Sequence, residues 1–284
     1  MSKSPKSPKL QFIELQEKLI RERPEAHEEA THLANRVVLC KNANADHIWK
    51  VLWNKPLYAN ARVSVARNWA DQLECDILGA WKTWGSHPDV FLISQIAPGI
   101  NRTSFKVEGD LARDIINRNS IALHRLYRIQ GAAIALRKRA EIFAKPFADL
   151  NRSGQGLTDQ IQMLQNEFGP GWGPVTILHF LTDLGLAVKP DLHLVKTMST
   201  LGLCKEISPN KVPSLKEAVR LNYLVMKLIL DIGNKSVTPH NLRYTDKILM
   251  EISRLGLLNL CSQNSQIRPG SEAKNETTYS IQGM

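Results

Sequence analysis

The chain has 284 residues, 43% of them hydrophobic, which suffices for a proper core in one large or two small domains. Its formal net charge of +10 favours polyanions such as nucleic acids as partners. No apolar run reaches the roughly eighteen residues of a membrane span, and no apolar signal segment follows Met1. We therefore expect a cytosolic, monomeric protein and exclude a membrane partner.

Helical periodicity recurs along the chain, and strand signals are nearly absent. Residues 1–10 are rich in Ser, Pro and Lys and indicate a basic flexible tail, and residues 262–284 indicate a polar flexible tail. The fold class that follows is all-α. The expected helices are 10–22, 25–40, 45–53, 61–82, 108–117, 120–145, 157–167, 175–186, 192–202, 214–232 and 239–255.

A one-signed basic stretch lies within residues 118–140. It contains no Asp or Glu, and its cations are Arg118, Arg125, Arg128, Arg137, Lys138 and Arg139. Apolar residues recur between them at helical spacing, which indicates an amphipathic helix or pair of helices. Arg137, Lys138 and Arg139 are our candidates for contacts with a DNA backbone, and a merely solvated basic face is the alternative. Further along, Arg243 and Lys247 near another helix start are candidates for one more backbone contact.

A glycine-rich turn comes next along the chain. It reads Gly169-Pro170-Gly171-Trp172-Gly173-Pro174. Glycines at alternate positions allow backbone angles that other residues resist, so successive N–H groups can converge on one anion. A helix that begins at Pro174 adds its dipole. The candidate backbone contacts are Gly169, Gly171, Trp172, Gly173, Val175 and Thr176, although the Trp172 side chain is expected to pack beneath the turn.

A single carboxylate follows the next helix. Lys189-Pro190 forces an extended connection, and Asp191 stands where a new helix must start, so it can cap free N–H groups. Hydrogen bonds from a helix start favour the charged form, and we expect Asp191 to be ionised. A fixed anion beside DNA is useful if a cation develops near it, such as the oxocarbenium-like sugar of a nucleotide that loses its base. The alternative is an ordinary helix cap.

The turn and the carboxylate together resemble the helix-hairpin-helix (HhH-GPD) DNA glycosylases over about residues 120–203. That family's signature is a Leu-Pro-Gly-x-Gly hairpin followed by one essential Asp, here Asp191, and its Asp-x-His is matched by His193. The resemblance implies a two-lobed helical protein that flips a base out of double-stranded DNA and hydrolyses its N-glycosidic bond. It implies an N-terminal segment 11–84 packing with the C-terminal lobe, a barrel lobe 85–188 containing the hairpin 168–176, and a C-terminal lobe 189–261.

Two departures from the family pattern refine this interpretation. Bifunctional members carry a nucleophilic Lys at the position of Val175, so the resemblance implies a monofunctional enzyme that leaves an abasic site. Some members hold an iron–sulfur cluster through closely spaced cysteines, whereas the four cysteines here are scattered. We expect no metal site and no cofactor, beyond at most a monovalent cation at the hairpin.

The base pocket and the substrate are less determined. Five of the six tryptophans lie within residues 49–84. Trp69, His124, Tyr127 and His193 are candidates for the pocket. The base is either hypermodified, as in foreign or phage DNA (for example glucosylated hydroxymethylcytosine, which implies antiviral defence), or damaged, which implies base-excision repair. Two alternatives stay open: a non-catalytic helix-hairpin-helix DNA-binding module, and a lyase that uses Lys189 or Lys196.

Overall fold

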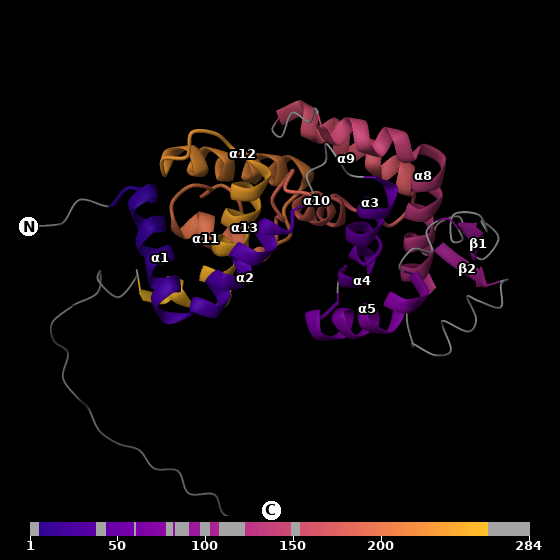
Figure 1. The fold of residues 1–284 in the computed structure, drawn as a ribbon, viewed down its shortest axis with the longest axis horizontal. Helices are drawn as coiled ribbons and strands as arrows, with labels where there is room; N and C mark the ends of the chain where they lie inside the picture. Colours follow the sequence, from indigo (N-terminus) through magenta and orange to yellow (C-terminus); the bar gives the residue numbers. More distant parts are fainter. Residues whose placement is uncertain are drawn as a thin grey trace, which may run out of the picture.

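The structure, a computed structural model, describes residues 6–37, 44–59, 61–77, 82, 91–96, 103–107, 123–148 and 154–260 (Figure 1). This part of the chain is mostly helical, in agreement with the all-α prediction. The predicted helix 108–117, the predicted C-terminal tail 262–284 and residues 1–5 of the predicted N-terminal tail lie outside it.

The described helices follow the predicted order. They are α1 (Pro8–Glu22), α2 (Pro24–Asn35), α3 (Ala45–Leu52), α4 (Lys55–Tyr58), α5 (Val63–Ile77), α8 (Leu123–Ala148), α9 (Gly154–Phe168), α10 (Pro174–Asp183), α11 (Leu192–Thr200), α12 (Leu215–Asp231) and α13 (Pro239–Arg254), with a final 3-10 turn at Leu257–Leu260. Local signals explain the sharp starts: Ser214 and Glu217 form a capping box on α12. The single turn α4 was not predicted, because one turn carries no periodicity.

One antiparallel β-hairpin corrects the expectation that strands are nearly absent. Strand β1 (Phe91–Ile96) pairs with β2 (Thr103–Val107), and Phe91 lies opposite Val107. The residues of β1 do not alternate strictly between apolar and polar, which explains why the sequence did not indicate this strand.

The helices surround two hydrophobic cores. The first is built from residues of α3, α4, α5, α8, α9 and α10, and the second from residues of α1, α2, α11, α12 and α13. Helix α12 also contributes Ala218 and Val219 to the first core. Between α10 and α11 the membership changes from the first core at Ala187 to the second at Val188. In Figure 1, α11 and α13 lie on one side of α10, while α3, α8 and α9 lie on the other.

The N-terminal segment 11–84 is divided between these cores. Helices α1 and α2 contact α13, and their buried residues belong to the second core. Helices α3 and α4 contact α8 instead, and their buried residues belong to the first core.

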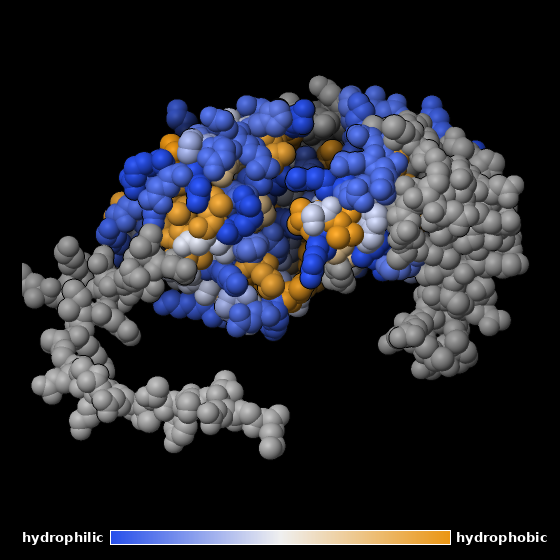
Figure 2. All heavy atoms as spheres, turned by 90° about the horizontal axis from the view of Figure 1, so that it is seen from below, coloured by the Kyte–Doolittle hydropathy of each residue, from blue (hydrophilic) through white to orange (hydrophobic). Residues whose placement is uncertain are grey.

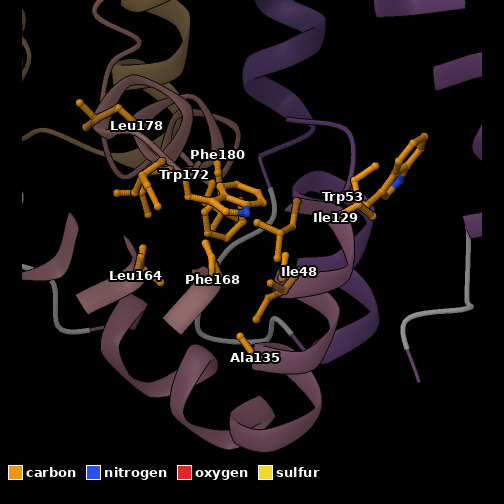
Figure 3. Packing of buried hydrophobic residues seen from close by; sticks show 14 of the residues in the cluster. Ile48, Trp53, Ile129, Ala135, Leu164, Phe168, Trp172, Leu178 and Phe180 are labelled. Carbon is orange, nitrogen blue, oxygen red and sulfur yellow. The ribbon is translucent and has the colours of Figure 1, made fainter. Parts of the chain in front are cut away.

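A group of aromatic rings lies beneath the glycine-rich turn. Phe168 at the end of α9 contacts Trp172, with ring centroids 4.7 Å apart, and Phe180 of α10 lies edge-on to Phe168 (Figure 3). All three side chains are buried, and so are Trp49 and Trp53 in the same core. Such packing fixes the angle between α9 and α10, and with it the shape of the turn that joins them.

Candidate functional site

The turn between α9 and α10, called the hairpin below, is a glycine-rich connection between two helices. Gly169 and Gly171 have φ of 81° and 90°, the left-handed region in which a side chain is strained. Gly173 differs from the expectation, because its φ of −73° and ψ of 164° are ordinary for any residue. It is the N-cap of α10 without a side-chain cap, and its backbone oxygen accepts from the N–H groups of Thr176 at 3.0 Å and Ile177 at 3.1 Å. Since Pro174 has no N–H, the N–H of Val175 is the one in this first turn for which no partner is found among the described residues.

Trp172 packs beneath the hairpin, and its side chain cannot contact DNA. It is buried, its indole Nε1–H donates to the backbone oxygen of Arg128 at 3.0 Å, and its own backbone oxygen accepts from Gln165 at 2.9 Å. Its place among the predicted DNA contacts is therefore corrected, because the residue as a whole is only 2% exposed. Val175 and Thr176 are partly exposed in the first turn of α10, where they can meet a bound backbone.

Arg128 of α8 supplies a cation at this hairpin. A Cβ added to Gly171 would lie 2.1 Å from Nε and 2.8 Å from Cζ of Arg128, so the guanidinium lies directly against the turn. Burial lowers the pKa of Arg128, and no carboxylate pairs with it within the described part of the chain. A half-buried guanidinium without an anion is a ready partner for phosphate. In the sequence, Arg128 is one of the cations of the basic stretch within residues 118–140, and nothing beside it indicates its contact with the hairpin.

Arg125, three residues earlier, has a structural role. Its guanidinium donates 2.8 Å hydrogen bonds to the backbone oxygens of Pro56, Leu57 and Ala59, which end α4. It also lies 5.0 Å from the centroid of the Trp69 ring. This buried arginine closes the α4 turn and does not face a ligand.

The other candidates of the basic stretch lie away from the hairpin. Arg137 and Lys138 are exposed on α8, about 14 Å along the helix from Arg128. The side chain of Arg139 and all of Arg118 fall outside the described residues. The structure thus keeps Arg137 and Lys138 free for a second phosphate contact but does not bring them to the turn.

Asp191 is the N-cap of α11, as predicted. Its Oδ1 accepts from the backbone N–H of Leu194 at 2.9 Å, and its own N–H donates to the backbone oxygen of Lys189 at 2.8 Å, which makes a tight turn around Pro190. The side chain is partly exposed, and no hydrogen bond to its Oδ2 is found among the described residues. One oxygen is thereby fixed by the helix while the other stays available.

A chain of alternating charges leads from the first core to this carboxylate. Lys55 of α4 pairs with Asp183 at the end of α10, and Arg243 of α13 donates to Asp183 and Asp246 at 2.9 Å each. Burial opposes ionisation of Asp183, but Lys55 and Arg243 outweigh it and hold its pKa far below the ordinary value. Arg243 is therefore not free for a DNA contact, and Lys247 pairs instead with Glu29 and Glu251.

Asp246 lies beside the turn that presents Asp191. Its Oδ1 accepts from the backbone N–H of Lys189 at 2.9 Å, and its Oδ2 accepts from Arg243. Burial, helped by the charge of Asp191 and opposed by that of Arg243, raises the pKa of Asp246 to about 6. Two carboxylates thus share this position, one partly exposed and one buried.

His179 of α10 and Tyr58 of α4 add neutral polar groups at the same junction. Their ring centroids are 5.8 Å apart. Burial lowers the pKa of His179 well below its ordinary value, and the charge of Lys55 lowers it further, so the imidazole is neutral at pH 7. Burial likewise raises the pKa of Tyr58. A neutral imidazole and a phenol can hydrogen-bond the edge of a base, and both side chains keep some exposure.

The predicted pocket residues lie elsewhere. Trp69 and Tyr127 pack partly buried against the first core. His124 lies on α8 near Arg125 and Arg128. Burial lowers the pKa of His124, and the charges of Arg128 and Arg125 add to this effect. His193 Nδ1 lies 3.2 Å from Ser253 Oγ and joins α11 to α13. The structure therefore gathers a different set at the junction with Asp191: Lys55, Tyr58, His179, Asp183, Arg243 and Asp246.

The junction between the two cores opens to the surface. Figure 2 shows this face of the molecule hollowed between its two halves, with both hydrophobic and hydrophilic residues beside the hollow. Such a hollow between two lobes is a common position for a ligand site.

Comparisons with family models, curated proteins and solved structures find no match to this chain. Within the described residues, no three His, Cys, Asp or Glu side chains come together in a way that would hold a metal ion. None of the described helices is both long and apolar enough to cross a membrane.

Proposed function

We propose that this protein is a monofunctional DNA glycosylase, which flips a modified base out of double-stranded DNA and hydrolyses its N-glycosidic bond. The observation that carries the proposal is the arrangement around α10. A hairpin with a cation against it begins this helix, and a partly exposed capping carboxylate follows its other end. With ten residues, α10 spans about 15 Å.

The hairpin end suits a phosphate. The N–H of Val175 has no partner among the described residues, the helix dipole favours an anion at this end, and Arg128 adds a full positive charge beside Gly171. These contacts read the backbone and not the bases, so they position DNA of any sequence. Arg137 and Lys138 extend the same basic face along α8.

The Asp191 end suits the chemistry. As the bond between sugar and base breaks, positive charge develops on the sugar, and the carboxylate of Asp191 stabilises it. Water then adds its oxygen to the sugar carbon, one proton goes to the departing base nitrogen, and an abasic site remains. Val175 replaces the nucleophilic lysine of bifunctional enzymes and offers no amine for a covalent intermediate.

The neutral pair Tyr58 and His179 fits the role of base recognition. A flipped base is read through hydrogen bonds to its edge, and uncharged groups discriminate between donor and acceptor patterns. The substrate is either a hypermodified base of foreign DNA or a damaged base. We favour the first, because the polar groups at the junction come from α4 and α10 and not from the residues that the family resemblance suggested.

A second candidate function is a non-catalytic DNA-binding module. One observation favours this function: the Oδ1 of Asp191 already accepts a hydrogen bond as a helix cap, which gives the residue a structural role. A passive module would gain nothing from a partly exposed carboxylate near DNA, since that charge repels phosphate.

The test is base release from defined duplexes. Duplexes that each contain one glucosylated hydroxymethylcytosine, alkylated base, oxidised base or mismatch are incubated with the protein, treated with alkali and analysed for the released base by mass spectrometry. Release from at least one duplex, together with cleavage only after alkali, supports a monofunctional glycosylase. Tight binding without release from any duplex supports the passive module, and a borohydride-trapped adduct supports a lyase.

A further inference from the structure

We infer that Asp246 is a positioning residue for Asp191, because it anchors the backbone of the turn that presents this carboxylate and places a second charge beside it. The inference rests on the proposed function, since it concerns how the same site works.

The anchoring is visible in the hydrogen bonds of the connection between α10 and α11. The N–H of Val188 donates to Asn222 of α12 at 3.1 Å, and the N–H of Lys189 donates to Asp246 of α13 at 2.9 Å. The N–H of Asp191 turns back onto Lys189, and Pro190 has no N–H. The Asp191 carboxylate is thus held by its bond from Leu194, and the backbone two residues before it is held by Asp246.

The charges around Asp246 make it more than a backbone anchor. It faces Arg243 on its own helix, and the charges of Lys189 and Asp191 reach it from the connection. Arg243 is shared with Asp183 of α10, which Lys55 of α4 also neutralises. A change in the protonation of Asp246 therefore changes the electrostatic potential at Asp191, because the groups between them are largely buried.

This arrangement predicts a pH-dependent site. Burial raises the pKa of Asp246 to about 6, so the residue is neutral in mild acid and charged at pH 7. Its charge adds to that of Asp191 where the cationic sugar forms, and base release should therefore quicken as the pH rises through this range.

The kinetic test compares Asp246→Asn with a matched control. The Asn keeps an acceptor for Lys189 but carries no charge. Glu251→Gln is the control, since Glu251 is also a buried, ion-paired acid of α13 and lies outside the site. Single-turnover base release is measured from pH 5 to 8 with the best duplex of the panel described above. For wild type and Glu251→Gln we expect the rate of base release to rise with pH around pH 6. For Asp246→Asn we expect a rate that does not change over this range and is roughly tenfold lower than that of wild type at pH 7.

A second measurement does not depend on activity. Amide hydrogen exchange at Leu194 reports the cap bond of Asp191 in the free protein. In Asp246→Ala, which loses the anchor, exchange at Leu194 should quicken about tenfold relative to wild type, while Glu251→Gln should leave it unchanged. The positioning role is overturned if amide exchange at Leu194 is unchanged in Asp246→Ala. It is also overturned if the rate of base release still rises around pH 6 in Asp246→Asn. Loss of base release in wild type with the exchange effect present overturns the proposed function alone.

Discussion

The guanidinium of Arg128 lies against Gly171 so closely that a Cβ at this glycine would come within 2.1 Å of Nε. The contact joins α8 to the hairpin and explains two features at once. Gly171 is required because both its φ of 90° and the space it leaves exclude a side chain, and Arg128 is held where a phosphate on the hairpin would meet it.

The glycines of the hairpin should therefore respond differently to alanine. Gly171→Ala should lower the free energy of unfolding by about 1 to 2 kcal/mol, since it forces a left-handed alanine against Arg128. Gly173→Ala should change it by less than about 0.5 kcal/mol, because its backbone is ordinary and nothing lies within 4 Å of an added Cβ. Urea denaturation measures both. DNA affinity should fall for Gly171→Ala, and equal effects of the two substitutions would contradict the hairpin geometry.

Arg128 should carry part of the salt dependence of DNA binding. Arg128→Ala should reduce the log–log slope of affinity against salt by about one, the amount expected when one phosphate is no longer neutralised. The combined change of Arg137, Lys138 and Arg139 to Ala should reduce the slope by up to about one for each phosphate that these side chains neutralise. Lys227→Ala, which removes an exposed charge from α12, is the control. A slope for Arg128→Ala equal to that of the control would show that Arg128 only packs against the turn.

Asp183→Asn should be strongly destabilising. It leaves Lys55 and Arg243 with less compensation in a largely buried position, which costs about 3 kcal/mol at pH 7. Because the pKa of Asp183 is lowered in the folded state, its contribution is present above the ordinary value near 3.8 and is lost as the pH falls below it. Denaturation at pH 7 and pH 3 should thus show a smaller difference between wild type and variant in acid. A difference that does not shrink would mean that the ion pairs do not stabilise the fold.

Asp246 should influence stability in the opposite direction. Its pKa is raised to about 6, so the folded state holds its proton where the unfolded chain has lost it, and stability is lost as the pH rises from about 4 to 6. Relative to Asp246→Asn, wild type should lose about 3 kcal/mol over this range. Denaturation curves of both proteins at pH 4.5, 5.5 and 7 test this. Parallel curves at all three values would show that Asp246 does not titrate there.

Local features of this fold could be predicted from the sequence. The starts of α10, α11 and α12 at Pro174, Asp191 and Ser214 depend on neighbouring residues only, so the sequence pattern indicates them. The burial of Trp172 followed from its size and the shape of the turn.

Contacts between distant residues could not be predicted. Nothing near Arg128 in the sequence indicates Gly171, and nothing near Asp191 indicates Asp246, because both pairs depend on how α8 and α13 pack. Trp69 and Tyr127 fit an aromatic pocket by type, and their packing against the first core likewise depends on contacts between distant residues. The backbone conformation of Gly173 could not be predicted either, because a glycine can adopt either sign of φ.

The central claim is that Asp191 is a catalytic carboxylate and more than a cap. Asp191→Asn keeps the side-chain oxygen that accepts from Leu194, so the fold should survive with a loss of no more than about 1 kcal/mol. Removal of the charge should slow base release by on the order of a hundredfold or more, because one preorganised electrostatic group is lost. Affinity for the same DNA should stay equal or rise, since an anion near phosphate is gone.

The decisive measurement is single-turnover base release by the folded Asp191→Asn variant, with DNA affinity determined on the same sample. We predict that base release is abolished while DNA binding is retained. Release at the wild-type rate would contradict the catalytic role and leave Asp191 as a helix cap.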